Sequence, residues 1–158
     1  MSGIDRFEGS LRLIAGVLAV VVAGLHAYWA LPDMARQLSV RQFPDPRPAV
    51  FLLATMAMLM GVVLLLQGFD PLPIYVGGVG LMITFLGGYV AWHTVLEHGA
   101  FWPGRQAHGH HGAGAVEIVI DHLAADAFAL VSKVTELVLL VVLVALIAIE
   151  LRRRGGTA

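Results

Sequence analysis

The chain alternates between long apolar runs and short polar segments. A helix rises about 1.5 Å per residue, so roughly 20 mostly apolar residues are needed to cross the hydrocarbon core of a membrane. Four runs meet this length, at residues 11–31, 49–67, 72–96 and 132–151. The pattern predicts an all-α integral membrane protein, a four-transmembrane-helix bundle with both termini on the same side. We expect residues 1–158 to form a single membrane domain.

The polar segments predict how these spans are connected. Residues 32–48 carry Pro44, Pro46 and Pro48, which cannot continue a helix, although Asp33–Val40 can form a short interfacial helix. The short turn before residue 72 makes the second and third spans an antiparallel hairpin. After a histidine-rich loop at 100–116, we expect one helix from Val116 or Glu117 to Leu151, with an amphipathic start at 117–131.

The third span has two distinct faces when its residues are placed at about 100° each. One face holds only small residues: Gly77, Gly80, Thr84, Gly87, Gly88 and Ala91. Such a face lets another helix backbone approach closely, which is how helices associate in lipid. The opposite face holds Tyr75, Tyr89, His93 and Glu97, and ionisable groups in a span must face protein or water.

Composition supports the membrane assignment and excludes several function classes. Hydrophobic residues make up 58% of the chain, charged residues 13%, and the mean hydropathy is +0.82. A net charge of −1 gives no basic excess for nucleic acid, and the absence of cysteine excludes disulfides, thiolate metal sites and iron–sulfur clusters. The sequence contains no H-E-x-x-H, nucleophile elbow or phosphate-binding glycine loop. It therefore favours a non-enzymatic role and identifies no catalytic residue.

All seven histidines are predicted to lie on one side of the membrane. His93 and Glu97 are one helical turn apart, and His122 and Asp126 repeat that spacing, so two antiparallel helices can present four ligands. His26 is a fifth candidate. Nitrogen and carboxylate oxygen suit a transition metal ion such as zinc, copper or iron. Four further histidines could deliver the metal: His98, His108, His110 and His111.

Other interpretations of these histidines remain open. Two facing histidines, His26 with His93 or His122, could instead hold haem b. Histidine and carboxylate side chains could also handle protons, or simply hydrogen-bond helix ends at the membrane interface. Deeper in the last span, Lys133 and Glu136 are spaced to form an intramembrane ion pair.

The sequence gives only a weak indication of orientation. The side of the termini carries five arginines and the other side four, but Arg152, Arg153 and Arg154 directly follow a span, which favours cytoplasmic termini in the cell membrane. We expect the protein to contact the lipid bilayer and another membrane protein or a second copy of itself. Two functions follow, a non-enzymatic accessory or structural subunit of a larger membrane assembly, or a metal- or haem-binding module.

Overall fold

The computed structural model describes residues 3–96 and 114–156, which form five helices and the turns between them. They are α1 (Gly3–Val40), α2 (Arg47–Leu66), α3 (Pro71–His93), α4 (Ala115–Ala125) and α5 (Ala127–Gly155). Four of them, α1, α2, α3 and α5, are long and apolar enough to cross a membrane. The structure thus confirms an all-helical protein with four candidate membrane spans.

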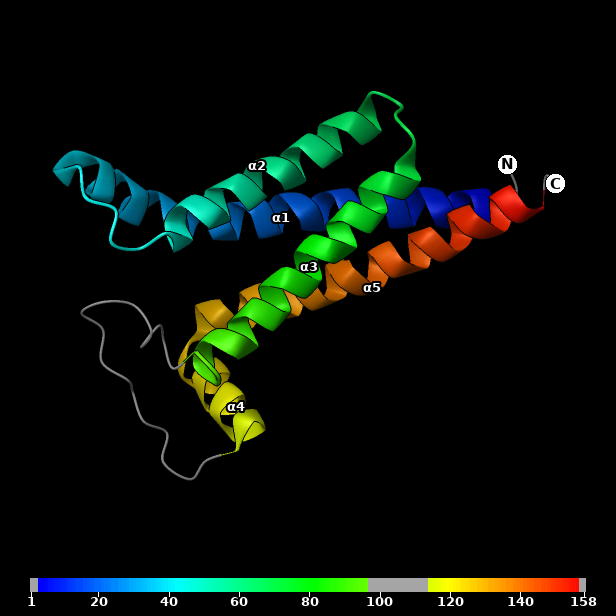
Figure 1. Cartoon of the computed structure of the whole chain (residues 1–158). Coiled ribbons are helices and arrows are strands. Elements are labelled where there is room, and N and C mark those ends of the chain that lie inside the picture. Colours follow the sequence, from blue (N-terminus) through cyan, green and yellow to red (C-terminus); the bar gives the residue numbers. More distant parts are fainter. Residues whose placement is uncertain (1–2, 97–113, 157–158) are drawn as a thin grey trace.

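The four long helices run alternately up and down (Figure 1). α1 lies between α2 and α5, and α3 crosses in front of α1 and α5 and contacts both α5 and α2. The first turns of α1 and the last turns of α5 lie at the same end of the molecule, which we call the terminal end. The short α4 lies at the opposite end, beside α3 and α5.

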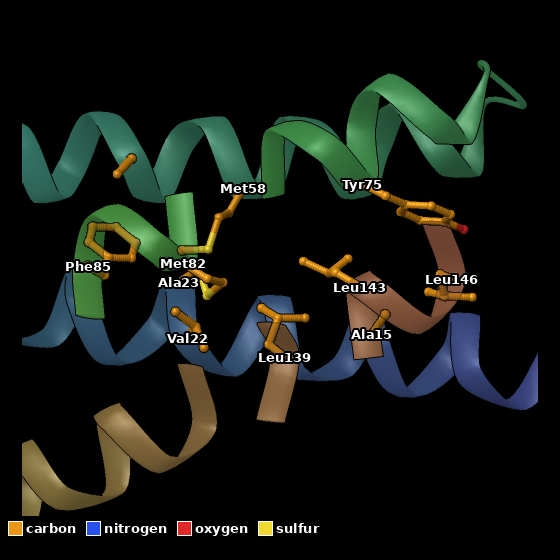
Figure 2. Close-up of a cluster of buried hydrophobic side chains, with 11 residues drawn as sticks. Ala15, Val22, Ala23, Met58, Tyr75, Met82, Phe85, Leu139, Leu143 and Leu146 are labelled. Atoms are coloured by element: carbon orange, nitrogen blue, oxygen red, sulfur yellow. The ribbon is translucent and has the colours of Figure 1, made fainter. Parts of the chain in front are cut away.

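All four long helices contribute to the hydrophobic core (Figure 2). Met58 of α2 and Met82 of α3 meet Val22 and Ala23 of α1, with Leu139 of α5 beside them. At Gly78 of α3, an added Cβ atom would lie 2.9 Å from Cδ1 of Leu143 on α5. Only glycine fits there without a shift of Leu143, so this small residue sets the spacing of the two helices.

The expected single helix from Val116 or Glu117 to Leu151 is wrong. The helix is interrupted at Asp126, whose backbone is extended (φ −124°, ψ 98°), so two helices, α4 and α5, form in place of one. The Asp126 carboxylate accepts hydrogen bonds from the amides of Phe128 and Ala129, at 2.9 and 3.1 Å. Aspartate favours this N-cap position because it satisfies amides that have no partner inside the helix.

α1 is longer than the predicted span, because it includes the residues expected to form a separate interfacial helix. It continues through Pro32 to Val40 instead of stopping at Leu31. Proline removes one backbone donor from the helix. In the turn that follows it, the Arg36 guanidinium donates to Asp33 at 2.9 Å. α3 is shorter than predicted and ends at His93, followed by a turn at residues 94–96.

Gly68 ends α2 and shapes the tight turn into α3. Its φ is +81°, and the amides of Gly68 and Phe69 donate to the carbonyls of Leu65 and Leu64, both at 3.1 Å. This is a Schellman motif, which needs a left-handed residue where glycine carries no steric penalty. A Cβ at Gly68 would meet no atom within 4 Å, so only its backbone conformation requires glycine.

We predict that Gly68→Ala lowers the free energy of unfolding by about 1 kcal/mol, because alanine is strained at positive φ. The matched control is Gly24→Ala, at a glycine inside α1 whose Cβ would also meet no atom. That change should raise stability by about 0.5 kcal/mol, since alanine is the better helix former. Unfolding in detergent, followed by circular dichroism, measures both variants. If both variants changed the free energy of unfolding in the same direction, the left-handed backbone at Gly68 would not be what requires glycine there.

Candidate functional site

A charged carboxylate lies completely buried in the middle of the bundle. The Glu136 side chain on α5 is 0% exposed. Its Oε1 accepts hydrogen bonds from Ser132 Oγ at 2.9 Å and from Lys133 Nζ at 2.7 Å, and its Oε2 lies 2.7 Å from the same ammonium. The ion pair expected between Lys133 and Glu136 is therefore present. The three residues share one helical turn, which places their side chains on one face of α5.

The third donor to this carboxylate comes from another helix. His26 Nε2 on α1 lies 3.0 Å from Glu136 Oε1. An ionised carboxylate only accepts hydrogen bonds, so the imidazole donates. The Lys133 ammonium and the Glu136 carboxylate carry opposite charges, which compensate each other inside the bundle. We call Ser132, Lys133, Glu136 and His26 the buried centre.

The other ring nitrogen of His26 is buried and has no hydrogen-bond partner among the described residues. The imidazole lies against two aromatic rings, Phe85 at 4.0 Å and Phe51 at 5.1 Å between ring centroids. In the neutral ring that donates through Nε2, Nδ1 carries only a lone pair. An acceptor without a partner is tolerated more readily in an apolar site than an unpaired N–H group.

A line of rings continues from the buried centre toward α4. The Lys133 ammonium lies 5.3 Å from the Tyr89 ring centroid. The Tyr89 ring is 4.4 Å from that of His93, and His93 is 4.3 Å from His122. Polar and aromatic groups of α3, α4 and α5 thus extend from the core to the end opposite the terminal end.

His122 is held in a defined orientation by its own helix. Its Nδ1 lies 2.8 Å from the Ile118 carbonyl oxygen, one turn earlier in α4. The carbonyl can only accept, so Nδ1 is protonated, and in the neutral ring Nε2 is the nitrogen with the lone pair. Metal-binding histidines commonly have this arrangement, in which a backbone carbonyl fixes the tautomer and the other nitrogen binds the metal.

The structure brings together only part of the predicted metal set. His93 and His122 are neighbours, whereas His26 pairs with Glu136 and Asp126 caps α5. Within residues 3–96 and 114–156, no group of three or more histidine or acidic side chains is placed to hold a metal ion. The remaining candidates lie outside the described residues: Glu97, His98, His108, His110 and His111.

Most of the small face of α3 is exposed, and its first residue, Gly77, lines a cavity beside α2. Gly77, Gly80, Thr84, Gly87 and Gly88 are all exposed, and Ala91 is half-buried. Cβ atoms placed on the four glycines would meet no atom within 4 Å. The opposite face of α3 buries Tyr75, Met82 and Phe85 in the core. The helix therefore packs inward through Tyr75, Met82 and Phe85, while most of the small face is on the surface.

A second charged cluster joins the helices at the terminal end. Glu8 on α1 accepts from Arg12 at 2.6 Å and from Arg153 on α5 at 3.0 Å. Arg154 is hydrogen-bonded to Asp70, the residue that caps α3. This hydrogen bond holds the pKa of the Asp70 carboxyl below its ordinary value. The stability it contributes is present above the unfolded-state pKa and is lost as the pH falls through the lower, folded-state value.

No protein-family model matches the chain, and comparisons with curated proteins and with solved structures give no match either.

We predict that Glu136→Ala lowers the free energy of unfolding by about 3–5 kcal/mol, because it leaves the buried Lys133 ammonium without a counter-charge. Replacing both partners, as Lys133→Met with Glu136→Leu, should recover most of that loss, since a buried ion pair contributes little over apolar residues of similar volume. Denaturant titration of the detergent-solubilised protein measures these values.

The control for this experiment is Glu117→Ala, at an exposed position on α4. It should change stability by no more than about 0.5 kcal/mol. If Glu136→Ala is as mild as this control, the buried centre does not stabilise the bundle.

Proposed function

We propose that the protein is a non-enzymatic accessory or structural subunit of a larger membrane assembly, and that it docks through the small face of α3. One observation carries this proposal: the glycines of that face are exposed, and a Cβ added to any of them would meet no atom within 4 Å among the described residues. The partner is a transmembrane helix of another membrane protein or of a second copy of this chain.

The arrangement of the small residues suits such a helix. Gly80, Thr84 and Gly88 follow one another at intervals of four residues, which stacks them along one line of α3. Small residues at this interval let two helix backbones come close, and van der Waals packing then holds them together in lipid. The Thr84 hydroxyl already donates to the Gly80 carbonyl at 2.8 Å, so the face presents no unpaired hydroxyl hydrogen.

The stability of α3 on its own does not explain these glycines. Each glycine inside a helix costs about 1 kcal/mol relative to alanine. Gly78 is the one glycine of α3 whose added Cβ would meet another residue within 4 Å. Close approach by a helix from outside the chain would give the others a physical role.

For the location, we propose the cell membrane, with both termini in the cytoplasm. The support is the run of arginines at 152–154, which directly follows the apolar part of α5. Positive residues next to a span tend to stay on the cytoplasmic side.

We predict that Gly80→Leu combined with Gly87→Leu lowers the assembled fraction about tenfold without unfolding the bundle, because leucine side chains keep the partner backbone away. Light scattering after gentle solubilisation and crosslinking in native membranes both report the assembled fraction. The control is Gly9→Leu with Gly24→Leu, since these α1 glycines are equally open. Wild-type assembly of the α3 variant would rule out this face as the docking surface.

A second function, transition-metal binding, is favoured by the histidine pair. The His93 and His122 ring centroids are 4.3 Å apart, and the Ile118 carbonyl holds His122 in the tautomer that directs Nε2 to a metal. Two imidazoles suit zinc, copper or iron. His26 would not take part, because its Nε2 is bonded to Glu136.

We predict that the untagged protein retains about one transition metal ion per chain after purification and reconstitution. His93→Ala and His122→Ala should each abolish this retention, because each removes one of two neighbouring ligands, whereas His26→Gln should leave it unchanged. Elemental analysis against protein concentration gives the stoichiometry. Equal metal content in all of these variants, or none in the wild type, would exclude the metal function.

A further inference from the structure

His26 joins two helices through one ring nitrogen and leaves its other ring nitrogen without a partner. Its side chain is 7% exposed, and its Nε2 lies 3.0 Å from Glu136 Oε1 on α5. Its Nδ1 is buried and has no hydrogen-bond partner among the described residues. The buried centre therefore contains a titratable nitrogen that the packing of the helices does not use.

The sides of the imidazole that face α2 and α3 are covered by aromatic rings. Phe51 on α2 lies 5.1 Å from the imidazole and Phe85 on α3 lies 4.0 Å from it, measured between ring centroids. The charged residue of α2, Arg47, is hydrogen-bonded to Asp45 at 3.0 Å. The groups that can respond to a charge on His26 therefore lie mainly on α5.

The α5 side of the buried centre holds one anion and one cation. The Lys133 ammonium lies 2.7 Å from each carboxylate oxygen of Glu136 and 5.3 Å from the ring centroid of Tyr89 on α3. With a neutral imidazole, the charges of the centre sum to zero. With an imidazolium, one carboxylate faces two cations, and the Nδ1–H group is a buried donor without an acceptor. Both effects cost free energy in the interior of a membrane bundle.

The buried centre reaches the surface of the bundle at Lys133, whose side chain is 14% exposed. Apolar side chains cover it in the direction of the terminal end. Val22 lies one turn from His26 in that direction, and Leu139 lies one turn from Glu136. Both are buried members of the hydrophobic core. A proton from solution therefore has its shortest way to the centre along Lys133.

From these observations we propose that the buried centre is a proton-binding site and that His26 accepts the proton at Nδ1. The proton bonds to the Nδ1 lone pair, no bond in the protein is broken, and the imidazole becomes an imidazolium. The added charge weakens the packing of α1 on α5, because Glu136 then faces two cations. Acidification thus loosens the contact that sets the register of these two helices. This site is separate from the small face of α3 and from the histidine pair at α4.

The first test compares the wild type with His26→Gln by denaturant unfolding of the full-length protein in detergent micelles. The glutamine amide still donates to Glu136 but cannot take up a proton. Histidine in an unfolded chain takes up a proton at about pH 6.5, so acid below this pH should favour unfolding of the wild type. One proton lowers the folding equilibrium constant by up to about tenfold per pH unit. We expect His26→Gln to lose this part of the pH dependence.

The control for this comparison is Thr55→Val, which removes a buried hydroxyl near the centre without changing a titratable group. Thr55 Oγ1 on α2 donates to the Ala23 carbonyl at 3.4 Å, one turn before His26. The variant should lower stability by the same factor at every pH. Its pH profile should therefore run parallel to that of the wild type.

Nitrogen-15 spectroscopy of the wild type in micelles reads the protonation of the ring directly and needs no variant to fold. Leu25–His26 is the one Leu-His pair in the sequence, so carbonyl-labelled leucine with nitrogen-labelled histidine identifies His26. At about pH 7.5 we expect a protonated Nε2 and a bare Nδ1, and at about pH 5 two protonated nitrogens in the folded protein.

Three results would overturn the proposal. One is a pH profile of His26→Gln that runs parallel to the profiles of the wild type and of Thr55→Val, which would place the titration elsewhere. The second is a His26 ring that already carries two protons at about pH 7.5, and the third is an Nδ1 that stays bare at about pH 5 in the folded protein.

Discussion

The rest of the bundle is organised around a carboxylate that has no access to water. Glu136 is fully buried, so donors from the protein must satisfy it, and they come from its own helix and from His26 on α1. This requirement places His26 and Glu136 at the same depth. From there, Glu8 is 18 residues along α1, about 27 Å, and Arg153 is 17 residues along α5, about 26 Å. These two residues also pair, so two polar layers fix one antiparallel register of α1 against α5.

The packing of helix α3 depends on the fit between helix surfaces instead of on buried charge. In lipid there is little hydrophobic gain from joining two helices, and the fit between surfaces decides which faces meet. Inside the chain, the fit at α3 comes from Gly78 against Leu143 and from large residues such as Met82 and Phe85 in the core. The other glycines make no such contact. A single helix therefore carries one face suited to this bundle and a second face suited to a helix from outside it.

Much of the fold could be predicted from the sequence, because span length and apolar composition are local properties. The break at Asp126 could not, since an aspartate on the polar side of an amphipathic pattern looks the same whether it faces water or caps a new helix. The pairing of His26 with Glu136 was missed for a related reason. A span ending at Leu31 places His26 near the membrane surface, whereas a helix that continues through Pro32 to Val40 carries it into the interior. Gly78 was missed because its close contact depends on which residue of α5 lies opposite.

The distribution of charge by depth indicates where this protein can bind other molecules. In the middle of the bundle, Ser132, Lys133 and His26 already occupy both carboxylate oxygens of Glu136. At the terminal end, Arg12, Arg153 and Arg154 pair with Glu8, Glu150 and Asp70, and at the other end His93 and His122 lie together. Water and lipid headgroups reduce the penalty for an unbalanced charge at these levels, whereas the hydrocarbon core does not. The pairing in the interior therefore serves to hold α1 and α5 in register.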